Sequence, residues 1–328
     1  MVRLRIGVAL FVLCAACDGD SPSILEPSGP GARRVESLWW PMLWISTVVF
    51  LIVAGMIVFS VVRGRKKNAS LDMRDVRWGE PFIAVAGVFI PVIILGAFFL
   101  LSLREMRGMA EDGEGAELQI EVTAKNWWWE ASYPNGPTTA NEIHIPTGEP
   151  VRLKLVAADV IHSFWVPRLQ VKIDHIPGRD NFLWLQADEP GTYRGQCAEF
   201  CGLQHANMAF HVVAQRPSDF ARWLETEGAP AQSSEEPGVT EGREIFESSS
   251  CAGCHAIRGT SASAQTGPDL THLASREWLA AGTFENNRAN LERFITDPQS
   301  MKPGVAMPPA ELDSEQIDAL VDYLERLE

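Results

Sequence analysis

The chain has 328 residues, enough for two or three structural units rather than one. It carries 42 Asp and Glu against 28 Lys and Arg, so its formal net charge at pH 7 is −14. This acidic balance argues against nucleic acid as a partner, and it suits either a basic protein partner or solubility alone.

Residues 1–17, MVRLRIGVALFVLCAAC, have the pattern of a signal peptide. Two arginines precede an apolar run that is too short to cross the ~30 Å hydrocarbon layer of a bilayer. Cys17 follows two alanines and resembles the lipid-attachment position of bacterial lipoproteins, although Cys14 stands where that box usually has leucine. We expect a lipidated Cys17; ordinary cleavage and an uncleaved anchor stay open. Residues 18–38 are rich in Pro, Gly and Ser and predict a linker.

Two uncharged apolar stretches follow, each longer than the ~20 residues that a membrane-spanning helix needs. We place these helices at residues 39–62 and 81–103. The loop between them, 63–80, is rich in Lys and Arg, so the positive-inside rule predicts that it is cytoplasmic. The sequence therefore predicts a multi-pass protein of the bacterial plasma membrane, with everything after the second helix on the oxidising outer side.

The outer part divides into two units. Residues 116–216 alternate short apolar runs with turn signals, which predicts an all-β antiparallel sandwich or barrel. Residues 226–239 lack aromatic residues and periodicity and predict a second linker. Residues 240–328 look all-α, because apolar residues recur at helical spacing after Ser314, a candidate N-cap.

The segment QCAEFCGLQHANM concentrates soft metal ligands at the end of the β unit. It contains Cys197, Cys201, His205 and Met208, and His162 lies upstream in DVIHSFWVP. A disulfide between the cysteines and a zinc site are both alternatives. However, a thioether is a poor zinc ligand and a good copper ligand. A mononuclear blue-copper site needs one cysteine, whereas two cysteines can bridge two copper ions.

These motifs resemble the periplasmic domain of cytochrome c oxidase subunit II over residues 36–215. The resemblance includes DVIHSFWVP, KIDHIPGR, QCAEFCGLQHANM, the two predicted membrane helices and the aromatic cluster AKNWWWEASYP. It implies a dinuclear copper A centre in a cupredoxin-like Greek-key barrel. In that centre Cys197 and Cys201 bridge the two coppers, and His162 and His205 bind one copper each.

The same resemblance implies three further roles. Met208 and the backbone carbonyl of Glu199 complete the two copper ligand sets, and the Glu199 side chain points toward a magnesium or manganese site at the contact with subunit I. A solvated carboxylate is the alternative for Glu199. Trp127, the first of three consecutive tryptophans, is the implied point where electrons enter; packing is the alternative for these rings. We interpret His144, His175, His211 and His272 as surface or hydrogen-bonded residues.

CAGCH, from Cys251 to His255, fits the C-x-x-C-H signature of covalent c-type haem. Cys251 and Cys254 add to the haem vinyl groups, and His255 lies under the iron. Residues 238–328 resemble a class I cytochrome c domain, which implies a methionine as the sixth ligand. Met307 matches the usual pattern, and Met301 is the competitor.

A cytochrome c domain fused to a copper A subunit resembles subunit II of a caa3-type oxidase. The resemblance implies the electron-input subunit of a proton-pumping oxidase, in which electrons pass from haem c to copper A and on to subunit I, where oxygen is reduced. The implied partners are subunits I and III, and an external cytochrome or a quinol-oxidising complex as donor.

Three other functions compete with this interpretation. A membrane-tethered copper carrier or assembly factor is the alternative, but a covalent haem would serve no purpose there. A nitrous-oxide-reducing enzyme needs a second, histidine-rich copper domain, which seven histidines cannot supply. A quinol oxidase subunit would lack the copper ligands.

Overall fold

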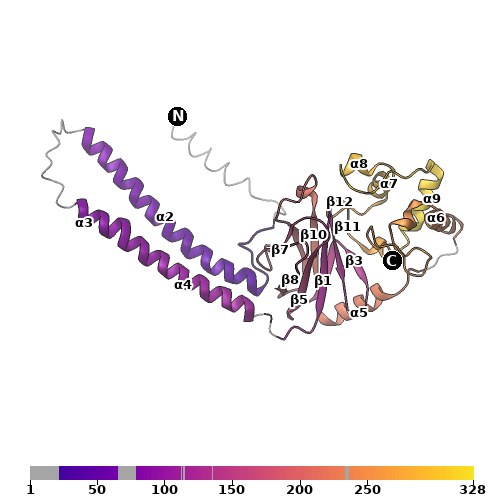
Figure 1. The fold of residues 1–328 in the computed structure, drawn as a ribbon, viewed down its shortest axis with the longest axis horizontal. Helices are drawn as coiled ribbons and strands as arrows, with labels where there is room; N and C mark the ends of the chain where they lie inside the picture. Colours follow the sequence, from indigo (N-terminus) through magenta and orange to yellow (C-terminus); the bar gives the residue numbers. More distant parts are fainter. Residues whose placement is uncertain (1–21, 66–78, 112, 114, 135, 233–235) are drawn as a thin grey trace, which may run out of the picture.

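The computed structural model shows two long helices, a β unit and a helical C-terminal unit in chain order (Figure 1). The structure describes residues 22–65, 79–111, 113, 115–134, 136–232 and 236–328. The predicted signal peptide and Cys17 lie outside these residues, as does most of the basic loop at 63–80.

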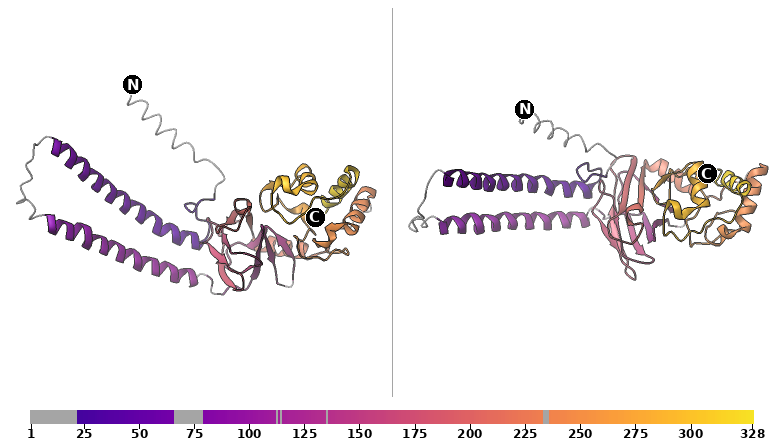
Figure 2. Two further views of the ribbon diagram at one scale, coloured as in Figure 1. Left: turned by 45° about the horizontal axis from the view of Figure 1, so that its top comes forward. Right: turned by 90° about the horizontal axis from the view of Figure 1, so that it is seen from above.

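The two N-terminal helices are long and apolar enough to cross a membrane. The first is α2 (Pro30–Arg65); the second is continuous through α3 (Gly79–Ala84), a π-helical turn η2 (Val85–Phe89) and α4 (Ile90–Glu111). They run side by side away from the β unit in all three views (Figures 1 and 2). Their most apolar windows are 0% buried within the chain.

Helix α2 begins at Pro30, inside the segment 18–38 that the sequence predicts as a linker. Proline is well suited to a first helical turn because its missing N–H has no partner there in any case. The amide of Ala32 donates to the carbonyl of Leu169 at 3.0 Å, and Arg33 forms an ion pair with Asp188. The start of the helix is therefore anchored to the β unit rather than tethered loosely to it.

The β unit consists of two five-stranded sheets whose apolar side chains fill the space between them. One sheet has the order β3-β2-β1-β5-β8, with β3 (Thr138–Ala140), β2 (Trp128–Ser132), β1 (Gln119–Lys125), β5 (Val151–Ala157) and β8 (Asn181–Leu185). The other has the order β4-β10-β9-β6-β7, with β4 (Glu142–Pro146), β10 (Ala209–Gln215), β9 (Gly191–Cys197), β6 (His162–Trp165) and β7 (Ile173–His175).

The strand pairing corrects the prediction of a purely antiparallel unit. Strand β1 pairs with β5 in parallel, and β10 pairs with β4 in parallel, while the other pairs are antiparallel. Side chains along β5 alternate strictly between buried and half-buried, as one buried sheet face requires. The alternation visible in the sequence fixes which face is buried, but it does not fix the direction of the neighbouring strand.

Helix α5 (Pro217–Gly228) follows the last strand and was not predicted. It packs Phe220 and Trp223 against the β unit, where the Trp223 ring stacks on His144 with the ring centroids 4.0 Å apart. The helix includes the first residues of the predicted linker 226–239. Beyond it, Ala231 donates its amide to the carbonyl of Arg258 at 3.0 Å, so the described part of this connection lies against the C-terminal unit.

The C-terminal unit is mainly helical, and a short β-ribbon corrects the all-α prediction. Its elements are α6 (Pro237–Ser248), η4 (Ser250–Gly253), η5 (Leu273–Ser275), β11 (Trp278–Leu279), β12 (Phe284–Glu285), α7 (Arg288–Thr296), α8 (Pro298–Met301) and α9 (Ser314–Leu324). Helices α6 and α9 cross closely because Gly242 leaves room for the Ala319 backbone. Asp313, rather than Ser314, is the N-cap of α9, and it forms a capping box with Gln316.

The half-buried His144 under α5 predicts a pH-dependent loss of stability. Burial lowers the pKa of His144 from 6.5 to about 4, so the unfolded chain binds a proton that the folded chain does not. The free energy of unfolding should therefore fall as the pH drops below 6.5, by about 1 kcal/mol near pH 5.5. His144→Phe keeps the stack on Trp223 and removes the titrating group. Thermal unfolding of both proteins between pH 7.5 and 5 should show a smaller loss in the variant; equal losses would contradict the prediction.

Candidate metal centres

The soft ligands of the β unit lie at one end of the second sheet. His162 opens β6, Cys197 ends β9, and β10 begins directly after Met208. Because β9 and β10 are antiparallel neighbours, the chain between them returns as a closed loop, held by the Cys197 amide donating to the Met208 carbonyl at 2.9 Å. The fold thus brings one upstream histidine to a loop that carries the other ligands.

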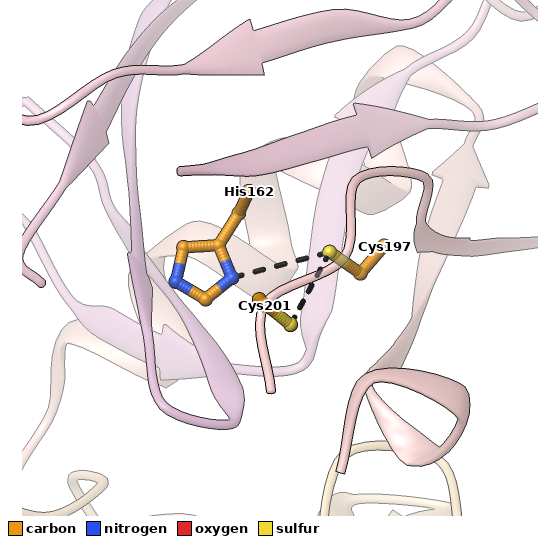
Figure 3. Close-up of side chains that lie close together, drawn as sticks. All are labelled: His162, Cys197 and Cys201. Atoms are coloured by element: carbon orange, nitrogen blue, oxygen red, sulfur yellow. Dashed lines mark hydrogen bonds between the residues drawn. The ribbon is translucent and has the colours of Figure 1, made fainter. Parts of the chain in front are cut away.

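The two cysteine sulfurs form the middle of this cluster (Figure 3). Cys197 Sγ and Cys201 Sγ are 3.7 Å apart, and Cys197 Sγ lies 3.9 Å from Nδ1 of His162. Cys201 Sγ lies 3.7 Å from Nδ1 of His205 and 3.7 Å from Sδ of Met208. The sulfurs are too far apart for a disulfide, and both cysteines are free. All five predicted side-chain ligands therefore meet at one place.

The backbone supplies one more ligand atom. The carbonyl oxygen of Glu199 lies 3.2 Å from Cys197 Sγ, on the inner side of the loop. The Glu199 carboxylate is half-exposed and lies 3.8 Å from Nζ of Lys172. The main-chain carbonyl and the side-chain carboxylate of Glu199 thus lie in different environments.

The charges of the two thiols support binding of a positive ion. The Cys201 thiol, as a hydrogen-bond donor, lowers the pKa of Cys197 to about 3 against the opposing effect of burial. The resulting thiolate in turn raises the pKa of Cys201, so the second proton is held. Two adjacent thiolates in a buried site need a cation, and a metal that accepts sulfur, nitrogen and thioether ligands fits this donor set. Zinc would leave Met208, which is fully buried beside Cys201, without a role.

Asp159 orients His162 and was missed in the sequence. Its Oδ1 lies 2.7 Å from Nε2 of His162, while its two oxygens also accept the amides of Asn126 and Val160, each at 2.6 Å. A carboxylate on the outer nitrogen fixes the tautomer, so the lone pair of Nδ1 faces Cys197. Its position three residues before His162 could have identified it in the sequence, because metal-bound histidines commonly hydrogen-bond a carboxylate through their other ring nitrogen.

The three tryptophans divide between the core and the surface of the site. Trp129 is buried and packs its ring against His162 and Phe210. Trp128 is half-buried beneath the ammonium of Lys125. Trp127 is also half-buried, and its indole Nε1 donates to the carbonyl of Cys201 at 2.9 Å. Of the three, Trp127 alone is hydrogen-bonded to a predicted copper ligand in the described part of the chain.

The residues of CAGCH are arranged for a covalent haem. Cys251 and Cys254 are both free, on and just after the short helix η4. Nδ1 of His255 donates to the carbonyl of Pro268 at 2.7 Å, which leaves Nε2 for an iron. Gly267 lies so close to the His255 ring that a side chain there would collide with it.

A cavity of about 460 Å³ opens next to these residues. Its walls include Cys251 and the two prolines that follow Met307, namely Pro308 and Pro309. Met307 packs against the core of the C-terminal unit, as Cys251 does. Met301 ends helix α8, and neither Met301 nor Met307 is among the residues that line this cavity. The donor set and the space beside it fit a haem held by two thioether bonds.

The remaining histidines are hydrogen-bonded or stacked, but not on the surface. Nδ1 of His175 donates to the Val156 carbonyl at 2.9 Å, and the residue is 0% exposed. His272 contacts the carbonyl of Ala229 at 3.1 Å, and His211 stacks on Trp278. The prediction of hydrogen-bonded histidines holds for His175 and His272, while His211 is stacked; all three rings are buried in the two units and the contact between them.

The C-terminal unit lies directly on the loop between β9 and β10, residues 197–208, which carries the predicted copper ligands and is called the copper-ligand loop below. Gln204 donates to the carbonyl of Pro303 at 2.7 Å, and the amide of Ala209 donates to the carbonyl of Ala281 at 3.0 Å. Lys302 is buried in this contact, which lowers its pKa to about 7. Three carbonyl oxygens within 3.0 Å of its Nζ favour the ammonium form, because only that form has three N–H groups.

Comparison with known proteins agrees with this arrangement. Residues 135–215 match the family described as "Cytochrome C oxidase subunit II, periplasmic domain", and residues 239–328 match the family described as "Cytochrome c". Cytochrome c oxidase subunit 2 of Alkalihalophilus pseudofirmus is 35% identical over 326 residues, covering 97% of this chain and 94% of that protein.

Two further relatives carry the same name. The protein of Bacillus sp. strain PS3 is 33% identical, covering 96% of this chain and 94% of its own, and that of Bacillus subtilis strain 168 is 30% identical, covering 99% and 97%. The similarity spans the apolar helices, the cupredoxin-like β unit and the cytochrome c unit together. The chain therefore belongs to the cytochrome c oxidase subunit 2 family.

Proposed function

We propose that this subunit holds a dinuclear copper A centre and one covalent haem, and that it is the electron-input subunit of a proton-pumping, caa3-type haem–copper oxidase. The observation that carries the proposal is the pair of buried sulfurs 3.7 Å apart, surrounded by two imidazoles, one thioether and one carbonyl. A copper carrier needs ligands that release the metal, whereas His162, Cys197, Cys201 and Met208 are buried.

The ligand roles follow from the positions of the donor atoms around the sulfurs. The sulfurs of Cys197 and Cys201 are adjacent, so both cysteines would hold the copper pair. His162 and the Glu199 carbonyl lie on the Cys197 side, while His205 and Met208 lie on the Cys201 side. When bound, the copper pair and the haem would supply one-electron redox chemistry. The closed loop keeps the donor atoms in place, which limits rearrangement between oxidation states.

The haem ligands follow the same logic. Cys251 and Cys254 would form the thioether bonds, and His255, fixed by the Pro268 carbonyl, would bind the iron from one side. Met307 is the sixth ligand, because it packs on the same core as Cys251 and precedes the prolines that line the cavity. A thioether in this position raises the haem potential relative to a second imidazole.

Trp127 is the point where electrons enter the copper unit. Its carbonyl accepts from Lys302 of the C-terminal unit at 3.0 Å, and its indole reaches the copper loop through the hydrogen bond to Cys201. No other tryptophan in the described residues makes both contacts. The route thus needs no movement of the two units.

The membrane arrangement and the partners complete the proposal. The two apolar helices form a hairpin across the bacterial plasma membrane. The β unit, a cupredoxin-like Greek-key barrel, and the haem unit lie on its outer side. Subunits I and III cover the helices, and an external cytochrome or a quinol-oxidising complex reduces the haem. The accessible Glu199 carboxylate meets a Mg²⁺ or Mn²⁺ at the contact with subunit I. The exposed apolar surface of both helices supports these contacts.

Metal analysis tests the copper assignment. The full chain should contain two coppers per haem iron, and its oxidised form should show a seven-line copper hyperfine pattern in electron paramagnetic resonance. Met208→Leu should keep both coppers and raise the copper potential, because a weak axial donor is lost. Met301→Leu, outside the copper loop, should leave both copper properties unchanged. One copper with four lines would contradict the proposal.

Exchange of the axial methionine tests the haem assignment. Met307→His should lower the haem potential and abolish the methionine–iron charge-transfer band, since imidazole is the stronger donor to ferric iron. Met301→His is the matched control and should preserve the band. If the band survives in Met307→His and disappears in Met301→His, the sixth ligand is Met301.

Removal of the indole tests the role of Trp127. Trp127→Ala should slow electron transfer from haem to copper severalfold after flash reduction, without loss of copper or a shift of either potential. Trp128→Ala, which removes a neighbouring ring without a contact to the copper loop, should have little effect. An unchanged rate in Trp127→Ala would show that electrons enter elsewhere, and loss of copper would show that the ring serves packing.

A further inference from the structure

Lys302 occupies an unusual position between the two outer units. It follows helix α8 in the C-terminal unit, and its side chain is 2% exposed. Lysine is almost never fully buried without partners, because desolvating an ammonium group is costly. Within the described residues no carboxylate lies within salt-bridge distance of it. Its partners must therefore be neutral groups that accept hydrogen bonds.

Three backbone carbonyls surround its ammonium group. Nζ donates to the carbonyl oxygens of Trp127 at 3.0 Å, Asn207 at 2.8 Å and Ala280 at 2.7 Å. An ammonium group has three N–H donors, so this set satisfies every one of them. Trp127 and Asn207 belong to the β unit, called the copper unit here, while Ala280 belongs to the C-terminal unit, called the haem unit. One side chain therefore joins the aromatic segment, the copper-ligand loop and the β-ribbon of the haem unit.

The residues next to Lys302 are shaped for the same contact. Gly304 has a φ of 89°, and a β-carbon on it would lie 3.5 Å from the outer edge of the Trp127 ring. Ala280 and Ala281 adopt φ values of 50° and 60°, which L-residues rarely do. This backbone aims the Ala280 carbonyl at Lys302 and the Ala281 carbonyl at the copper unit.

A second contact lies at the other edge of the interface. Glu142, on β4, accepts the backbone amides of Glu277 at 2.9 Å and Trp278 at 3.3 Å. These two amides belong to the β-ribbon region of the C-terminal unit and find their acceptor in the copper unit. Hydrogen exchange of these two amides can therefore report whether the two units are docked, at a place distant from Lys302 in the chain.

We propose that Lys302 is a positioning residue that fixes the haem unit on the copper unit and keeps Trp127 inside their contact. This inference rests on the proposed function only in taking Trp127 as the point where electrons enter. Because the haem unit itself covers that point, an external donor reduces the haem and does not reach the copper unit directly. The connection between the units then joins two domains that stay docked, rather than tethering a haem unit that moves freely until it meets the copper unit.

Hydrogen exchange of the full chain in its oxidase tests docking without reference to electron transfer. Lys302→Met keeps the length of the side chain and removes the ammonium group. Exchange of the Glu277 and Trp278 amides should rise about 30-fold, which corresponds to about 2 kcal/mol at 1.4 kcal/mol per tenfold change. The matched control is Lys154→Met, which breaks ion pairs with Glu121 and Asp180 in the copper unit and should leave these amides unchanged.

Flash kinetics on the same samples supply the second measurement. In the unmodified chain, the rate of electron transfer from haem to copper should be independent of solvent viscosity. In Lys302→Met it should be at least about tenfold slower and should fall as viscosity rises, because docking then precedes transfer. Both midpoint potentials should stay the same. If Lys302→Met does not fold, Glu142→Leu should give the same viscosity dependence from the other edge of the contact.

The two proposals fail in different ways. Unchanged amide exchange in Lys302→Met, or a viscosity-dependent rate in the unmodified chain, overturns the positioning role of Lys302. An unchanged transfer rate in Trp127→Ala, together with raised amide exchange in Lys302→Met, overturns only the role of Trp127 and leaves the docking contact standing.

Discussion

Two buried sulfur atoms, Cys197 Sγ and Cys201 Sγ, lie 3.7 Å apart with both cysteines free. A thiolate at Cys197 holds the proton on Cys201, so both sulfurs become thiolates only when a positive ion shares them. The surrounding structure serves this requirement: strands β9 and β10 close the loop, Asp159 fixes the His162 tautomer, and Trp127 binds the Cys201 carbonyl.

The ligands could be predicted because they are local in sequence. Four of the five side chains lie within the thirteen residues of QCAEFCGLQHANM, and the haem motif spans five. The residue types and their spacing, including the methionine, were enough to identify them, and the structure brings every predicted copper ligand together. His162 was found through a second motif, not through its contact with the loop.

The contact between the units could not be predicted in this way. Lys302 and Trp127 are 175 residues apart, and neither the lysine nor its carbonyl partners carries a recognisable motif. The parallel pairs of β1 with β5 and β4 with β10 were missed for a related reason, since a strand pattern shows burial but not the neighbour. Helix α5 is different: Phe220, Trp223 and Leu224 have helical spacing, so its amphipathic face was visible in the sequence.

The contact between the two units shows that the haem domain fused to this subunit is held in one place rather than loosely tethered. A flexible tether raises the effective concentration of a donor, whereas the buried Lys302 and Glu142 contacts fix one geometry. The Lys302 contact depends on the copper loop being formed, because Asn207 and Trp127 offer their carbonyls from that loop and the aromatic segment beside it. Copper K-edge X-ray absorption of the full chain tests the metal centre beneath this arrangement most directly. We expect sulfur and imidazole nitrogen around each copper and a copper–copper scattering shell. A nitrogen-only first shell, or no metal–metal shell in a copper-replete sample, would contradict it.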